Sequence, residues 1–133
     1  MQRIALIGIT GRAGSRISSE LLARGHRVTG IARNTADTPA QAGLTLQSAD
    51  ASRADAIAPL LQGHDVVVSA TRFDGGPTAG VLLDAVRQAG VRRVLVVGGA
   101  GSLEVAPGVA LIDTPYVFQF PYCRRREPGV CAR

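Results

Sequence analysis

Short apolar runs alternate with amphipathic segments along most of this chain. The runs are rich in β-branched residues and continuous enough to suggest strands buried on both faces of a parallel sheet. The third run is weaker than the others and follows a turn-rich stretch. The predicted strands cover residues 3–8, 27–32, 44–47, 65–70 and 93–97.

Three segments between these runs repeat apolar residues at helical spacing, at 15–24, 52–61 and 77–89. Glycine ends the first and third, Ser52 with Asp55 predicts a capping box for the second, and Pro77 stands at the first position of the third. Pro59 should shorten or kink the second helix. The alternation predicts an α/β fold. We expect a Rossmann-like doubly wound parallel sheet of order 3-2-1-4-5 with helices on both faces.

The pattern stops near residue 115. Beyond it, most of the chain's aromatic residues, both cysteines and three consecutive arginines crowd together without helical or strand periodicity. We therefore predict a domain over residues 1–115 and an irregular tail over 116–133. The cysteines have no histidine near them, so incidental thiols are favoured over a metal site, and no metal is expected.

Three glycines follow the first predicted strand at three-residue spacing. In this position they predict a dinucleotide-binding turn, because residues without Cβ let the backbone approach a pyrophosphate and let the next helix point its amides at it. The spacing G-x-x-G-x-x-G differs from the usual dehydrogenase pattern. The turn residues assigned to the cofactor are Gly8, Thr10, Gly11, Arg12, Ala13 and Gly14.

Arg33 ends the second predicted strand, about 20 residues beyond the glycines, where NAD-binding domains carry an acidic residue. A guanidinium there favours the 2′-phosphate of NADP(H) over a ribose hydroxyl, and Arg12 could add a second charge. The alternative is that both arginines are solvent-facing loop charges. On this pattern NADP(H) is the expected cofactor.

Further cofactor contacts are expected where the third and fourth strands end, because ligands bind at the carboxyl ends of parallel strands. Asp50 either meets the adenine or only starts a helix. The remaining strand-end residues assigned to the cofactor are Ala51, Ala70, Thr71 and Arg72.

Catalytic candidates are few. His26 and His64 precede strands and so belong to the opposite edge of the sheet, where structural roles are favoured. Ser102 is on the expected ligand side and is the one catalytic candidate, through a hydrogen bond to substrate or nicotinamide and not as a nucleophile. Tyr116 lacks a lysine to lower its pKa.

Charge and composition exclude several functions. Lysine is absent, which excludes Walker, Schiff-base and Tyr-x-x-x-Lys chemistry. The net charge of +5 resides largely in the tail, so nucleic acid is not an expected partner. No apolar stretch is long enough to span a membrane and no signal peptide is evident, so we expect a cytoplasmic protein without membrane partners.

Five blocks in order resemble the NmrA-like, NAD(P)H-binding group of atypical short-chain dehydrogenase/reductases, which includes flavin reductase and biliverdin reductase B-like proteins. The resemblance implies a Rossmann fold, NADP(H) at the glycine turn and Arg33, and hydride transfer to a flavin, quinone or similar small acceptor. Its catalysis would depend on positioning the nicotinamide. The blocks run from Gly8 to Ile17, Arg24 to Thr29, Ile31 to Asn34, Val67 to Thr71 and Val96 to Leu103.

The resemblance covers Met1 to Pro115, whereas members of that group continue into a C-terminal substrate lobe. This predicts a truncated or frame-shifted member whose last strand leaves an exposed sheet edge. That edge could form a homodimer, aggregate or be covered by the tail folding back over it. Three functions stay open. They are an NADPH-dependent oxidoreductase, a non-catalytic NADP(H)-binding module or redox-sensing regulator, and an inactive fragment.

Overall fold

The computed structural model describes residues 1–72, 76–99 and 103–114. The chain divides into two compact units, Met1–Val97 and Gly98–Arg133, and each is described by itself. The tail predicted to be irregular, residues 116–133, lies outside the described residues, and so does Ser102. The predicted boundary near residue 115 therefore stays a prediction.

The first unit is built on a parallel sheet of five strands in the order β3-β2-β1-β4-β5, which confirms the predicted topology. The first strand along the chain lies in the middle of the sheet, where it pairs with β2 on one side and β4 on the other. The strands are β1 (Arg3–Ile7), β2 (Arg27–Ala32), β3 (Leu44–Ser48), β4 (Val66–Ser69) and β5 (Val94–Val96).

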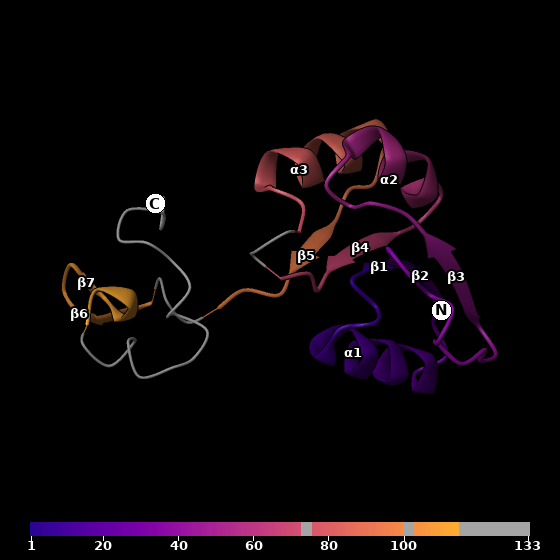
Figure 1. Cartoon of the computed structure of the whole chain (residues 1–133), viewed down its shortest axis with the longest axis horizontal. Coiled ribbons are helices and arrows are strands. Elements are labelled where there is room, and N and C mark those ends of the chain that lie inside the picture. Colours follow the sequence, from indigo (N-terminus) through magenta and orange to yellow (C-terminus); the bar gives the residue numbers. More distant parts are fainter. Residues whose placement is uncertain (73–75, 100–102, 115–133) are drawn as a thin grey trace. The chain divides into compact units, whose positions relative to one another are not determined.

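Helices cover both faces of this sheet, as a doubly wound fold requires. In Figure 1, α1 (Arg12–Ala23) lies on one face, while α2 (Ala54–Leu61) and α3 (Ala79–Gln88) lie side by side on the other. Right-handed connections explain the change of face, because the chain moves outward from β1 to β2 and then returns past β1 to reach β4. The carboxyl ends of β1 and β4 meet where this direction reverses.

Alternation along β1 divides the apolar core into two clusters. Ile4 and Leu6 point to the α1 face, where they join Val28, Val66 and others. Ala5 and Ile7 point to the α2 and α3 face. Every one of these β1 side chains is less than 5% exposed, so the central strand is buried on both sides.

The structure corrects two helix starts. The capping box of Ser52 and Asp55 is wrong, because α2 begins after Arg53 with no side-chain cap and Ser52 instead donates to Asp50. Helix α3 begins after Thr78, whose Oγ1 accepts the Val81 amide at 3.3 Å, so Pro77 precedes the cap instead of occupying the first turn. The Thr78 hydroxyl caps the start of α3, whereas no side chain caps the start of α2.

The second unit contains a small hairpin that the sequence pattern did not predict. Strands β6 (Glu104–Ala106) and β7 (Val109–Ala110) pair antiparallel around Gly108, which has a φ of +74°. A 3-10 turn, η2 (Leu111–Asp113), follows and the Leu111 amide donates to the Leu103 carbonyl at 2.8 Å.

Candidate functional site

A cleft of about 170 Å³ opens at the carboxyl ends of the central strands. Its walls come from the turn after β1, the ends of β2 and β3, and the segment after β4. This is the position at which parallel α/β sheets bind ligands. The lining residues are Ile7, Gly8, Thr10, Gly11, Ile31, Ala32, Arg33, Ala49, Asp50, Ala51, Ala70, Thr71, Arg72 and Gly76.

Gly8 packs the turn after β1 directly against the end of β4. Its φ is +88°, a left-handed conformation that glycine adopts without strain. A Cβ at this position would lie 2.8 Å from the Ala70 carbonyl oxygen and 3.1 Å from the Thr71 amide nitrogen. The Gly8 amide is also fixed, because it donates to the Ile31 carbonyl at 2.8 Å. A side chain at residue 8 would therefore close the gap between two cleft walls.

Gly11 and Gly14 shape the start of α1. A Cβ on Gly14 would collide with the Gly8 carbonyl oxygen, so this glycine lets the helix approach the turn. Gly11 is the N-cap and supplies no side-chain acceptor, and the first turn carries no acidic residue. The first amides of the helix and the positive end of its dipole are thus left for an anion.

Arg33 and Asp50 lie close together on the β2 and β3 side of the cleft. The Ser52 backbone amide donates to Asp50 Oδ1 at 2.9 Å, and the Ser52 hydroxyl donates to the same oxygen at 2.8 Å. These bonds, with the nearby charges of Arg33 and Arg53, hold the pKa of Asp50 below its ordinary value. Ser52 therefore holds the Asp50 carboxylate in place, and the nearby charge of Arg33 adds to the preference for its charged form.

The segment after β4 forms the opposite wall. The Ala70 amide donates to the Ile7 carbonyl at 2.9 Å, which continues the sheet one residue beyond β4. Ala70 and Thr71 are half-buried and leave room for a ligand next to the glycine turn. Arg72 is exposed at the rim.

Most residues predicted to hold the cofactor line this single cleft, although they come from separate parts of the chain. Arg12, Ala13 and Gly14 do not line it and lie instead in the first turn of α1. Sequence reasoning did not name several lining residues that lie at the ends of β1 and β2 or follow β3 and β4. These are Ile7, Ile31, Ala32, Ala49 and Gly76, and strand-end position alone would have pointed to the first three.

The two histidines lie at the amino ends of their strands, away from the cleft, as predicted. His26 Nδ1 accepts the Gln2 amide at 3.2 Å. His64 Nδ1 lies 3.1 Å from the Leu61 carbonyl and its Nε2 lies 2.8 Å from Thr29 Oγ1, so His64 joins α2 to β2. Both imidazoles bind parts of the fold.

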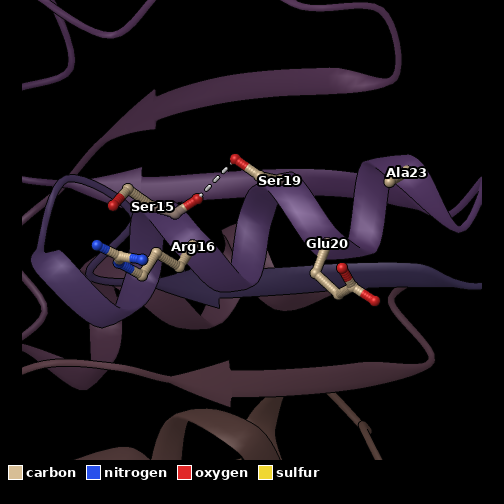
Figure 2. Close-up of a pocket in the computed structure, with 5 residues that line it drawn as sticks. All are labelled: Ser15, Arg16, Ser19, Glu20 and Ala23. Carbon is tan, nitrogen blue, oxygen red and sulfur yellow. Dashed lines mark hydrogen bonds between the residues drawn. The ribbon is translucent and has the colours of Figure 1, made fainter.

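A larger hollow, of about 420 Å³, lies on the outer face of α1. Figure 2 shows that one helix supplies all the side chains that line it: Ser15, Arg16, Ser19, Glu20 and Ala23. Ser19 donates to the Ser15 carbonyl at 3.0 Å and Glu20 pairs with Arg24 at 2.7 Å, so much of this polar surface is satisfied within the helix. We assign the site to the smaller cleft, where four chain segments converge.

Within the described residues, no helix is long and apolar enough to cross a membrane. The same part of the chain holds no group of three or more metal-ligating side chains.

Known proteins share this fold and much of its sequence. YwnB of Bacillus subtilis (strain 168), which is uncharacterised, is 38% identical over 129 residues, covering 90% of this chain and 57% of that protein. A Burkholderia pseudomallei structure named as an exported protein is 46% identical with a TM-score of 0.71, covering 86% of this chain and 56% of its own. A Streptococcus pneumoniae TIGR4 structure named as an NADH-flavin reductase is 31% identical with a TM-score of 0.66, covering 91% and 58%.

This chain therefore spans between half and two thirds of the length of these relatives. Residues 8–123, most of the chain, match the family described as NAD(P)H-binding. The cleft lies where such a fold binds a dinucleotide, which is consistent with this match. The chain belongs to the NAD(P)H-binding family.

Proposed function

We propose that the cleft binds NADP(H) and that the protein is an NADPH-dependent oxidoreductase. The observation that carries the proposal is that one cleft is lined both by Gly8 and Gly11, which lead into the uncapped start of α1, and by Arg33 directly after β2. The first suits a pyrophosphate and the second suits a further phosphate on the adenosine.

The strand order gives the cofactor its direction. The turn after β1 takes the pyrophosphate, and Arg33 on the β2 side takes the 2′-phosphate of the adenosine half. Asp50, held by Ser52, then borders the adenosine and the nicotinamide half extends toward the segment after β4.

The bound nicotinamide would supply a hydride, and the chain's own residues would bind and orient it. The described part of the cleft offers no nucleophile paired with a base, so the residues present support catalysis by positioning. A flavin, quinone or similar small acceptor is the proposed partner. The resemblance to flavin reductases and the name of the pneumococcal relative support this class of acceptor.

Cofactor choice is tested by titrating NADPH and NADH into the wild-type protein and Arg33→Asp. We expect the wild type to prefer NADPH and the variant to prefer NADH, because aspartate repels the 2′-phosphate and accepts hydrogen bonds from a ribose hydroxyl. Arg16→Asp, an equal charge change on the outer face of α1, is the matched control and should keep the wild-type ratio. An unchanged ratio in Arg33→Asp would contradict the assignment.

Turnover is tested separately by following NADPH oxidation with flavin mononucleotide and with a quinone. Steady oxidation supports the oxidoreductase. A non-catalytic NADP(H)-binding module is the second candidate, favoured by the fact that the chain spans little more than half of its relatives. Saturable NADPH binding without turnover would select that candidate.

The cytoplasmic location predicted from the sequence stays a prediction. One of the similar structures is named as an exported protein, so its name does not support that location.

A further inference from the structure

Ser69 is a buried hydroxyl at the end of β4. Its residue is 2% exposed, and Ser18 in α1 is the one comparable buried polar residue among those the structure describes. A hydroxyl removed from water destabilises the fold unless it is hydrogen-bonded. The other residues of β4 are valines, and an apolar side chain would fit this buried position as well. The presence of a serine here therefore suggests that its hydroxyl has a role.

That partner is Thr71, two residues further on. Ser69 Oγ and Thr71 Oγ1 share a hydrogen bond of 3.2 Å, and Thr71 lines the cleft. Gly76 lies beside the same hydroxyl, because a Cβ built on Gly76 would lie 2.9 Å from Thr71 Oγ1. The buried serine therefore orients a hydroxyl at the cleft wall, and the glycine leaves space next to it.

We propose that Ser69 is a positioning residue that holds the Thr71 hydroxyl toward the ribose of the nicotinamide half. This rests on the proposed function. Arg33 follows β2, the glycine turn follows β1 and Thr71 follows β4, so the three lie in this order across the sheet. A dinucleotide with its adenosine at Arg33 and its pyrophosphate at the turn brings its second ribose to the β4 side.

The chemistry of two hydroxyls fits a ribose. Each has one hydrogen and two lone pairs, and their mutual bond uses one hydrogen. If Ser69 donates, Thr71 keeps its hydrogen for the ligand, and if Thr71 donates, it keeps both lone pairs to accept from the ligand. Ribose hydroxyls both donate and accept, so they match either arrangement.

The test measures dissociation constants for NADPH and for adenosine 2′,5′-bisphosphate, which lacks the nicotinamide half. Thr71→Val removes the hydroxyl at nearly constant shape and should weaken NADPH about three- to tenfold, the value of one hydrogen bond. Thr71→Ser keeps the hydroxyl and should restore binding. Ser69→Ala should weaken NADPH by a similar or smaller factor, and none of the three should alter binding of the bisphosphate.

A double variant separates positioning from general damage. In the Thr71→Val background, Ser69→Ala should have no further effect on NADPH, because its influence passes through Thr71. Ser18→Ala controls for the loss of a buried serine elsewhere, and thermal unfolding of each variant reports its stability.

Three outcomes would overturn the inference. They are a full effect of Ser69→Ala in the double variant, equal weakening of the bisphosphate, or unchanged NADPH binding in Thr71→Val. If the wild type binds neither nucleotide, the proposed function fails and the inference fails with it. If the wild type binds NADPH and both hydroxyl variants bind it equally well, only the inference fails.

Discussion

The two edge strands of the sheet differ in what they present to solvent. In β3, the residues Thr45, Gln47 and Ser48 are exposed, while Leu44 and Leu46 are half-buried against the α1 face. In β5, the exposed residues are apolar, with Leu95 at 47% and Val96 at 58%. Alternation suits β3 to an edge, whereas β5 has the continuous apolar composition of a strand that is paired on both sides.

The contrast shows that an apolar run predicts a strand but not its burial. β4 and β5 have similar apolar sequences, yet the four residues of β4 are at most 7% exposed. β4 has a neighbour on each side, whereas β5 pairs only with β4 in the described sheet. The polar edge and the apolar edge can therefore be compared experimentally, together with the central strands between them.

The largest expected effect distinguishes the crowded start of α1 from the open segment after β5. Gly14→Ala should destabilise the fold by about 3 kcal/mol and abolish NADPH binding, because its Cβ meets the Gly8 carbonyl. Gly98→Ala is the matched control, since nothing lies within 4 Å of a Cβ there. Urea unfolding and NADPH titration measure both, and equal losses would show that the crowding at Gly14 has no special role.

A valine truncation then compares neighbouring strands. Val67→Ala in β4 should cost about 2 kcal/mol, through lost burial and a residual cavity. Val96→Ala in β5 should stay within about 0.5 kcal/mol, as for an exposed position. The free energies of unfolding provide the test, and a loss at Val96 as large as that at Val67 would mean that β5 is covered in solution.

Exchanging the character of the two edges tests their tendency to associate. A homodimer through β5 stays a prediction, and Val96→Lys should lower self-association if this edge forms one. Gln47→Val gives β3 an apolar edge and should raise self-association. Sedimentation velocity over a range of concentrations measures both. If Val96→Lys leaves self-association unchanged, the contact between copies does not involve β5.

The smallest effect concerns the turn after β3. Ser52→Ala removes one of two hydrogen bonds to the Asp50 carboxylate, so the charged form is less stabilised and the pKa of Asp50 should rise. The Ser52 backbone bond remains, so the pKa should stay below its ordinary value. Carboxyl carbon NMR titration measures the change.

The direction of the Asp50 pKa shift also determines how the stability of the protein depends on pH. The pKa of Asp50 is lowered on folding, so its contribution to stability is present at neutral pH and is lost as the pH falls through the folded-state pKa. The slope of stability against pH should therefore be shallower in Ser52→Ala. A fall in the pKa of Asp50 would contradict the assigned hydrogen bond.

Much of the fold could be predicted from the sequence because its parallel strands are continuous apolar runs separated by glycines and helical stripes. The start of α3 was predicted too early, at Pro77, because a proline signals the first helical turn whereas the cap is the Thr78 hydroxyl, which accepts the Val81 amide. The hairpin of β6 and β7 was missed because its strands are only three and two residues long, although Pro107 and Gly108 mark its turn.

The residues of the candidate site also fall into those that the sequence predicted and those that it did not. Gly8, Arg33 and Thr71 could be proposed as cofactor-binding residues, because parallel strands place their carboxyl ends on the same side of the sheet. Ser69 and Gly76 could not, since their relation to the Thr71 hydroxyl depends on side-chain direction and a close backbone approach. Periodicity carries no information on such contacts.

The central place of β1 also has a consequence for synthesis on the ribosome. Its register joins Ile4 to Val28 and also to Val66, so this strand, which precedes the others of its sheet along the chain, acquires its second neighbour only after α2 has been made. During that interval the nascent chain carries an apolar strand with one open side. We expect this sequence-distant pairing to slow folding, and to make the interval before β4 emerges the period in which a chaperone protects the chain most.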